Sequence, residues 1–132
     1  MSKKPFNYWQ DHSANYLIMA NQFEKRKPMD SPDGHGKKTG DCGDSVEFFL
    51  RVNQGILEDI CFDIDGCKNT NACANTVIHL AEGETIDEAW NLTPEDVINY
   101  LETLPEDSRH CAELSMGAFY LALSSLKNNK PG

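Results

Sequence analysis

Residues 45–65 read SVEFFLRVNQGILEDICFDID, and their apolar side chains alternate with polar ones on both sides of a turn that ends at Gly55. Alternation over two such runs, residues 45–52 and 56–65, predicts an antiparallel hairpin with one buried face. The residues expected on that face are Val46, Phe48, Leu50 and Val52 from the first strand and Ile56, Ile60, Phe62 and Ile64 from the second.

The rest of the chain is predicted to be mostly helical. Residues 6–24 place aromatic and apolar side chains three and four positions apart, as in an amphipathic helix, and Pro28 should end this helix by Lys27. Thr93 precedes a proline and two acidic residues, which is a typical helix start. The helices after Gly66 are expected at residues 71–82, 86–91, 94–104 and 111–127. Strands followed by helices predict an α+β fold, in which a small antiparallel sheet of two or three strands packs against helices.

The length of 132 residues is that of a single domain. Within it we expect an N-terminal helix in residues 1–27, a core in residues 44–127 and a short tail in residues 128–132. Residues 28–43 hold two prolines and four glycines, so they are predicted to be a loop throughout. A loop of this length inside a small domain is usually functional or mobile.

The chain is acidic, because 21 acidic residues against 12 basic ones give a formal net charge of -9. The excess lies after residue 40, where five basic residues face seventeen acidic ones. A protein that binds nucleic acid through its phosphates needs a basic face, so the sequence argues against a nucleic-acid partner. We find neither a signal-peptide pattern nor an apolar run long enough for a membrane span, and we expect a cytoplasmic protein without a membrane partner.

The five cysteines are an odd number, and in a reducing compartment they are expected to be metal ligands, reactive thiols or buried residues. Three lie at the ends of predicted elements: Cys42 before the first strand, Cys67 after the second and Cys111 at the start of the last helix. The hairpin should bring Cys42 and Cys67 to one end of the sheet. Asp44 follows Cys42 by two residues, which puts both side chains on one side of an extended segment, and His110 adjoins Cys111.

Thiolate, carboxylate and imidazole groups bind Zn²⁺, iron and iron–sulfur clusters. The sequence has no Cys-x-x-Cys pair, which argues against zinc-ribbon and ferredoxin spacings, and glycine-rich loops around the candidates favour an open, exchangeable site. Cys67 and Cys111 are expected close to helix N-termini, which favour the nucleophilic thiolate. Three such thiols at one place can accept sulfur or bind a metal.

The candidates occur in three motifs: Gly-Asp-Cys42-Gly-Asp44, then Gly66-Cys67 after the hairpin, then Leu104-Pro105 followed by His110-Cys111. In this order and spacing, over about residues 40–127, they resemble the IscU and NifU N-terminal family of iron–sulfur cluster assembly scaffolds. The resemblance implies a non-enzymatic scaffold that receives iron, takes sulfur from a cysteine desulfurase, builds a 2Fe-2S cluster and passes it to acceptor proteins.

The resemblance also implies roles for individual residues. Cys42, Cys67 and Cys111 would bind the cluster and accept sulfur as persulfide, and His110 would be a further candidate ligand. Asp44 would keep the cluster labile, and the same positions would bind Zn²⁺ when no cluster is present. The sequence does not decide whether the chain forms a homodimer.

The sequence departs from the family pattern in three places. Family members carry Leu-Pro-Pro-Val-Lys before the His-Cys pair as a handle for an Hsp70-type chaperone, whereas this chain reads Leu-Pro-Glu-Asp-Ser at residues 104–108, which argues against chaperone-driven release. The helix after Cys67 reads Lys-Asn-Thr-Asn-Ala-Cys-Ala-Asn instead of a Ser-rich run, and the aromatic helix in residues 6–24 matches no part of the pattern. These differences indicate a divergent branch.

The other cysteines and histidines have simpler explanations. Cys61 and Cys73 are expected to be structural, with Cys73 also a candidate partner of Cys67 in a disulfide or sulfur relay. His12 and His79 are expected to pack in the fold or lie on its surface, while His35 in the glycine-rich loop is a weaker candidate for metal contact.

Two other functions compete with the scaffold hypothesis. The first is a zinc module, in which Cys42, Asp44, Cys67 and Cys111 form a closed site that only stabilises the fold. The second is a thiol enzyme, either a sulfurtransferase or a redox protein, in which His110 acts as the base for a cysteine nucleophile.

Overall fold

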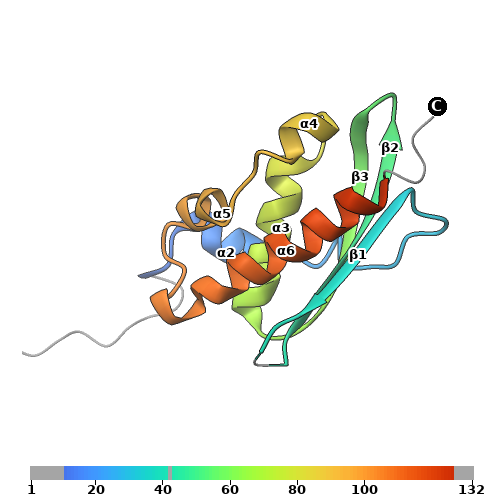
Figure 1. Cartoon of the computed structure of the whole chain (residues 1–132). Coiled ribbons are helices and arrows are strands. Elements are labelled where there is room, and N and C mark those ends of the chain that lie inside the picture. Colours follow the sequence, from blue (N-terminus) through green and yellow to red (C-terminus); the bar gives the residue numbers. More distant parts are fainter. Residues whose placement is uncertain (1–10, 42, 127–132) are drawn as a thin grey trace, which may run out of the picture.

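The computed structural model describes residues 11–41 and 43–126. Its elements follow in the order α2 (Ala14–Ala20), β1 (Gly34–Thr39), β2 (Ser45–Asn53), β3 (Ile56–Asp65), α3 (Lys68–Ala81), α4 (Ile86–Ala89), α5 (Pro94–Leu101), the 3-10 turn η1 (Glu106–Ser108) and α6 (Arg109–Ser125). The strands form an antiparallel sheet in the order β1-β2-β3. Helices α6 and α3 pack against the sheet, and α2 and α5 pack on α3 (Figure 1). The predicted α+β fold with a small antiparallel sheet is therefore confirmed.

The predicted hairpin is formed by β2 and β3. Its turn consists of Gln54 and Gly55, which both have positive φ angles, 54° and 80°. Positive φ at both central residues is typical of a type I′ turn, which suits the twist of a two-residue hairpin. At the other end Ser45 pairs with Asp65, so the residues that precede β2 and follow β3 lie together.

The buried face of β3 differs from the prediction near the turn. Leu57 is fully buried whereas Ile56 is half-buried, although Ile56 was expected in the core. The register shifts here, since Arg51 pairs with Asp59 but the next residue of β2 pairs with Leu57, which leaves Glu58 as an extra residue on β3. An extra residue in one strand reverses the side-chain alternation beyond it.

The prediction of a loop throughout residues 28–43 is wrong, because Gly34–Thr39 forms β1. This strand packs against α6 so closely that a Cβ atom on Gly36 would lie 2.3 Å from the backbone nitrogen of Ala122 and 2.7 Å from the carbonyl oxygen of Ala118. Glycine serves here to let two backbones approach, without a positive φ angle. Sequence patterns miss such a strand because glycine is depleted in strands in general.

Within the described residues the predicted N-terminal helix is present as α2, which follows the N-cap Ser13 and ends at Ala20 instead of residue 24. Residues 6–10 of the prediction lie outside the described part. Beyond α2 the chain turns toward the sheet. The carbonyl oxygen of Lys25 accepts a hydrogen bond from the backbone N–H of Phe62 at 3.0 Å, and Arg26 forms an isolated parallel bridge with Phe62. The segment after α2 therefore lies along β3.

The later helices agree with the prediction except at their ends. Cys67 is the N-cap of α3, which begins three residues earlier than expected. Thr93 caps α5 in a capping box with Asp96, as the sequence predicted for this start. The same helix ends at Leu101 instead of residue 104, because Glu102 takes up a positive φ of 64°.

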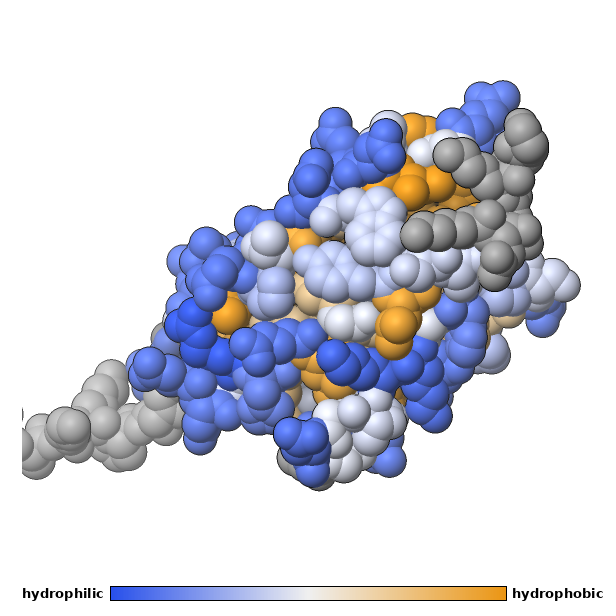
Figure 2. Space-filling model, in the orientation of Figure 1, coloured by the Kyte–Doolittle hydropathy of each residue, from blue (hydrophilic) through white to orange (hydrophobic). Residues whose placement is uncertain are grey.

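The core lies between the sheet and the helices. Phe48 of β2 stands between Phe62 of β3 and Phe119 of α6, with ring centroids 6.5 Å and 5.7 Å apart, and all three rings are fully buried. Burial of side chains of this size contributes roughly 1.5–3 kcal/mol each. The face seen in Figure 2 is mostly hydrophilic, with small separate apolar areas. Among the described residues the structure has no helix that is both long and apolar enough to cross a membrane.

Candidate metal centre

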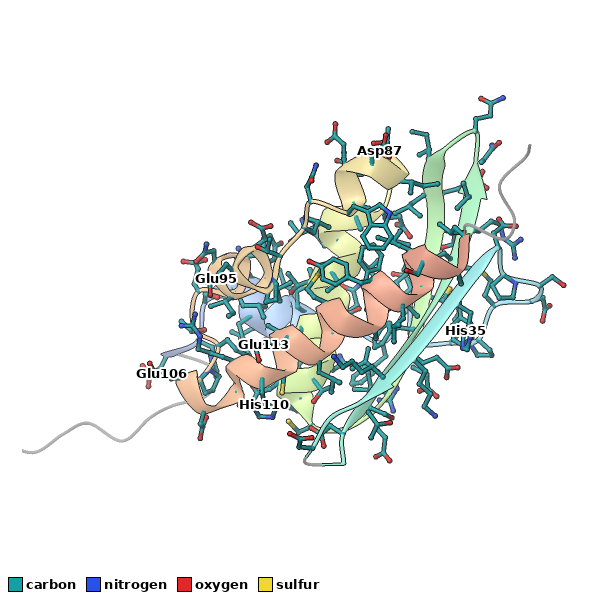
Figure 3. The ribbon with its side chains drawn as sticks, viewed as in Figure 1. His35, Asp87, Glu95, Glu106, His110 and Glu113 are labelled. Atoms are coloured by element: carbon teal, nitrogen blue, oxygen red, sulfur yellow. The ribbon has the colours of Figure 1, made fainter. Side chains whose placement is uncertain are left out.

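Three elements meet at the end of the sheet opposite the hairpin turn. Asp44 precedes β2, and the turn Gly66-Cys67 connects β3 to α3. His110 and Cys111 lie in the first turn of α6, and Figure 3 shows His110 at this end of the helix. Hairpin topology and the start of α6 therefore bring together residues from three distant parts of the chain.

The donor atoms of Asp44, His110 and Cys111 all lie within 4.8 Å of one another. The three residues differ in exposure. His110 is exposed, Asp44 is half-buried and Cys111 is only 2% exposed. The sequence predicted all three as candidate ligands, and the structure brings them together. One carboxylate, one imidazole and one thiol are a donor set that suits Zn²⁺ or iron.

The imidazole of His110 is oriented for this cluster of donors. Its Nδ1 lies 3.0 Å from the carbonyl oxygen of Asp107, and because a carbonyl only accepts hydrogen bonds, Nδ1 carries the hydrogen and donates. The other ring nitrogen, Nε2, lies 3.7 Å from Cys111 Sγ. A ring nitrogen held in this way is typical of histidines that bind metals through the other nitrogen.

Cys67 is not among the donors that lie within 4.8 Å of one another, but Thr70 contacts both Cys67 and that group. The Oγ1 atom of Thr70 lies 3.9 Å from Cys67 Sγ, 3.7 Å from Cys111 Sγ and 3.4 Å from Asp44 Oδ2. Cys67 is exposed, in contrast to Cys111. Cys42, the remaining predicted ligand, lies outside the described residues, two positions before Asp44.

The two cysteines expected to be structural are buried. Cys73 is completely buried in α3, and this burial, with smaller contributions from Cys111 and Cys67, raises the pKa of its thiol well above the usual value. Cys61 is 2% exposed although it alternates with the buried Ile60 and Phe62 along β3, and burial followed by the charge of Asp59 raises its pKa. Burial therefore disfavours the thiolate form of both cysteines.

The other histidines contact other parts of the fold. His12 bonds through Nδ1 to Thr103 Oγ1 at 2.7 Å, and burial lowers its pKa. His79 packs against Tyr100 with ring centroids 4.9 Å apart. His35 on β1 pairs with Glu47, and Figure 3 shows it at the opposite end of the strand from His110.

A polar network that sequence reasoning missed connects α2 to the segment before His110. The hydroxyl of Tyr16 donates to Asn69, and the amide of Asn69 donates to the Ser108 hydroxyl at 2.9 Å. Ser108 occupies the position of the lysine in the family pattern Leu-Pro-Pro-Val-Lys. The asparagine-rich start of α3 is visible in the sequence, but no sequence motif in α2 indicates which residues its asparagines contact.

A family model described as the NifU-like N terminal domain matches residues 24–131, more than three quarters of this sequence. The chain belongs to the NifU-like N-terminal domain family. The match includes every candidate ligand, from Cys42 to Cys111, and the segment before β1.

Several curated relatives of this NifU-like domain are named iron–sulfur cluster assembly scaffold protein IscU. The protein of Buchnera aphidicola subsp. Schizaphis graminum is 36% identical over 90 residues, which cover 67% of this chain and 70% of the relative. The protein of Escherichia coli K12 is 28% identical over 116 residues, or 82% and 90% of the two chains. IscU 1 of Archaeoglobus fulgidus is 33% identical over 82 residues, or 62% of this chain, and the match spans 54% of its length.

Solved structures confirm the NifU-like fold. A nitrogen-fixing NifU-like protein (N-terminal) from Brucella abortus superposes with a TM-score of 0.72 at 17% identity, covering 89% of this chain and 95% of that one. A protein assigned to cluster assembly in the SUF system of Fervidobacterium islandicum AW-1 gives a TM-score of 0.70 at 17% identity, covering 84% and 95%.

Proposed function

We propose that this chain is an iron–sulfur cluster assembly scaffold. It accepts iron, takes sulfur from a cysteine desulfurase, assembles a 2Fe-2S cluster and transfers it to acceptor apo-proteins. The observation that carries this proposal is the gathering of Asp44, His110 and Cys111 within 4.8 Å, in a chain of the NifU-like family. The names of the curated relatives support it.

The cluster is cargo in this proposal, and Cys42, Cys67 and Cys111 hold it, with Asp44 and His110 as further ligands. The exchange of cargo needs a site that solvent and partners reach, and the exposed Cys67 and His110 provide that access. A hard carboxylate among soft thiolates weakens a site for iron and sulfide, so Asp44 makes the cluster easier to release. The same donor set accommodates Zn²⁺ in the absence of a cluster.

We propose assembly and transfer rather than catalytic turnover, with the three ligand cysteines also serving as sulfur acceptors. A desulfurase and acceptor proteins are the partners that this chemistry requires. Residues 104–108 lack the lysine of the chaperone handle, and Ser108 in its place is bonded to Asn69, which supports release without an Hsp70-type chaperone.

The proposal is tested by anaerobic reconstitution with ferrous iron, cysteine, a cysteine desulfurase and a thiol reductant, which supplies the electrons that convert persulfide sulfur to sulfide. Visible absorption, iron and acid-labile sulfide are measured for the wild type, Cys42→Ser and Cys61→Ser. We expect a charge-transfer spectrum with equal iron and sulfide in the wild type and in Cys61→Ser, whose thiol is buried in the sheet. Cys42→Ser should lose the spectrum.

The competing hypothesis of a structural zinc module predicts a different outcome in the same experiment. A wild-type chain that forms no cluster but retains zinc through mild chelation would be a structural zinc module. Loss of the cluster in Cys61→Ser, with unchanged thermal unfolding, would contradict the ligand set.

A further inference from the structure

Thr70 lies at the centre of the candidate ligands without being one of the predicted residues. It is in the first turn of α3, three positions after the N-cap Cys67, and its side chain is completely buried. Its hydroxyl oxygen lies 3.4 Å from a carboxylate oxygen of Asp44 and within 3.9 Å of the sulfur atoms of Cys67 and Cys111. One hydroxyl therefore contacts donors that come from three separate segments.

A threonine hydroxyl has one hydrogen and two lone pairs. A carboxylate can only accept, so the hydrogen of Thr70 goes to Asp44, which leaves the lone pairs of the hydroxyl facing the two thiols. The separation of 3.4 Å exceeds the roughly 2.7 Å of a tight O–H···O bond, so we expect the contact to shorten when an ion draws the ligands together.

The position of the Thr70 hydroxyl is maintained by the turn beneath it. A Cβ atom on Gly66 would lie 2.7 Å from Thr70 Oγ1 and 3.0 Å from Thr70 Cβ, so any side chain at position 66 would displace the hydroxyl. Gly66 has no positive φ, and the missing side chain is therefore the reason for glycine at this position. Branching at Cβ further restricts the Thr70 rotamer.

The geometry points to Thr70 as a positioning residue of this site: its hydroxyl donates to Asp44 and holds that carboxylate beside the cysteine ligands. Thr70 does not contact the metal and acts through Asp44. This assignment rests on the proposed function in taking Asp44 and the cysteines as ligands. Removal of the hydroxyl leaves the carboxylate free to turn toward solvent.

The test uses Zn²⁺ alone, whose dissociation constant is measured on the full chain by competition with a chromophoric chelator. Thr70→Val has the same shape without the hydroxyl, and Thr70→Ser keeps the hydroxyl. We expect Thr70→Val to weaken zinc binding by about 10- to 100-fold, the range for residues that orient metal ligands, and Thr70→Ser to remain within about 3-fold of the wild type.

The effect of Thr70→Val is also measured in a chain that already carries Asp44→Ala. If Thr70 acts through Asp44, adding Thr70→Val to Asp44→Ala should change the zinc affinity by less than about 2-fold. Thermal unfolding of each variant shows that the chain is folded, and Thr70→Ala, with the same expected loss, takes the place of Thr70→Val if the valine does not fold.

Three outcomes would overturn the assignment. They are wild-type affinity in Thr70→Val, an equal loss with and without Asp44, and a wild-type chain that binds no zinc. Failure of the scaffold function is seen separately, because it appears as a chain that assembles no cluster in reconstitution while the zinc comparison still gives its result.

Discussion

The side-chain amide of Asn75 donates to the carbonyl oxygen of Met19 at 2.8 Å and thereby joins α3 to the end of α2. The same amide donates to Gln22 at 2.9 Å, and the amide of Asn71 donates to the same stretch of backbone. The last carbonyls of a helix have no partner within it, so these asparagines serve as a cap supplied by another helix. The asparagines at the start of α3 thus hold the end of α2 in place on α3.

Asn75→Asp should lower the free energy of unfolding by about 1–3 kcal/mol, because a carboxylate cannot donate to the two carbonyls and the site is 3% exposed. Urea unfolding followed by circular dichroism measures the change. Asn99→Asp, the same substitution at an exposed position of α5, is the control and should be nearly neutral. Equal stabilities of the two variants would show that the amide contributes little.

Gly36→Ala should lower the free energy of unfolding by about 1–3 kcal/mol, because the new methyl group would overlap the backbone of α6. Gly40→Ala is the matched control in the same segment, where a Cβ would have an ordinary 3.5 Å contact with Leu114. Chemical denaturation of both variants measures the difference. A stable Gly36→Ala variant would contradict the close packing of β1 on α6.

The ion pair between Lys25 and Asp59 predicts a pH-dependent contribution to stability. The hydrogen bond from Lys25 lowers the pKa of Asp59 in the folded chain. The stabilisation is therefore present above the pKa of about 3.9 that Asp59 has in the unfolded chain, and it is lost as the pH falls through the lower pKa of the folded chain. The pair is partly exposed, and Asp59→Asn should therefore cost only about 0.2–1 kcal/mol at pH 7.

Thermal unfolding of the wild type and Asp59→Asn between pH 7 and pH 2 tests this prediction. The two curves should converge as the pH falls below about 3.9. Asp63→Asn, which weakens the more exposed pair with Arg26, is the control. A constant difference at all pH values would mean that the charge of Asp59 has no part in the effect.

Thiol alkylation should distinguish the described cysteines. Cys67 is exposed and should react with iodoacetamide first, while Cys61, Cys73 and Cys111 are at most 2% exposed and should react at least about tenfold more slowly, since they need a local opening. Peptide mass spectrometry over time measures the order, and denatured chain should remove the differences. Equal rates at Cys67 and Cys111 in the native chain would contradict the burial of Cys111.

Asp44→Ala should make the loaded cluster more resistant to chelators, by about tenfold, and slow its transfer to an apo-acceptor, because a hard ligand has been removed from a soft site. Asp41→Ala, an exposed acidic residue in the same loop, is the control for charge alone. The decay of visible absorption and the gain of acceptor activity are the measurements. Transfer at the wild-type rate would refute the role of Asp44.

The hairpin was predictable because alternation and a glycine turn are local signals, and its topology sufficed to bring Asp44 and Cys67 to one end. The start of α6 then added His110 and Cys111. Two parts of the structure had no local signal. Strand β1 depends on contact between Gly36 and a helix more than eighty residues away, and Thr70 belongs to the site only through contacts with residues outside its own helix.

The contact of β1 with the last helix has a consequence for the order in which the chain folds during synthesis. The β2–β3 hairpin needs only neighbouring residues and can form as soon as both strands have left the ribosome. Helix α2 packs mainly on α3, and β1 packs on α6 in addition to pairing with β2, so both complete their contacts only when later segments have been made. Helix α6 also brings Cys111 and His110. The proposed ligands His110 and Cys111 are therefore made after the others, and the nascent chain cannot hold the full proposed ligand set before α6 has been synthesised.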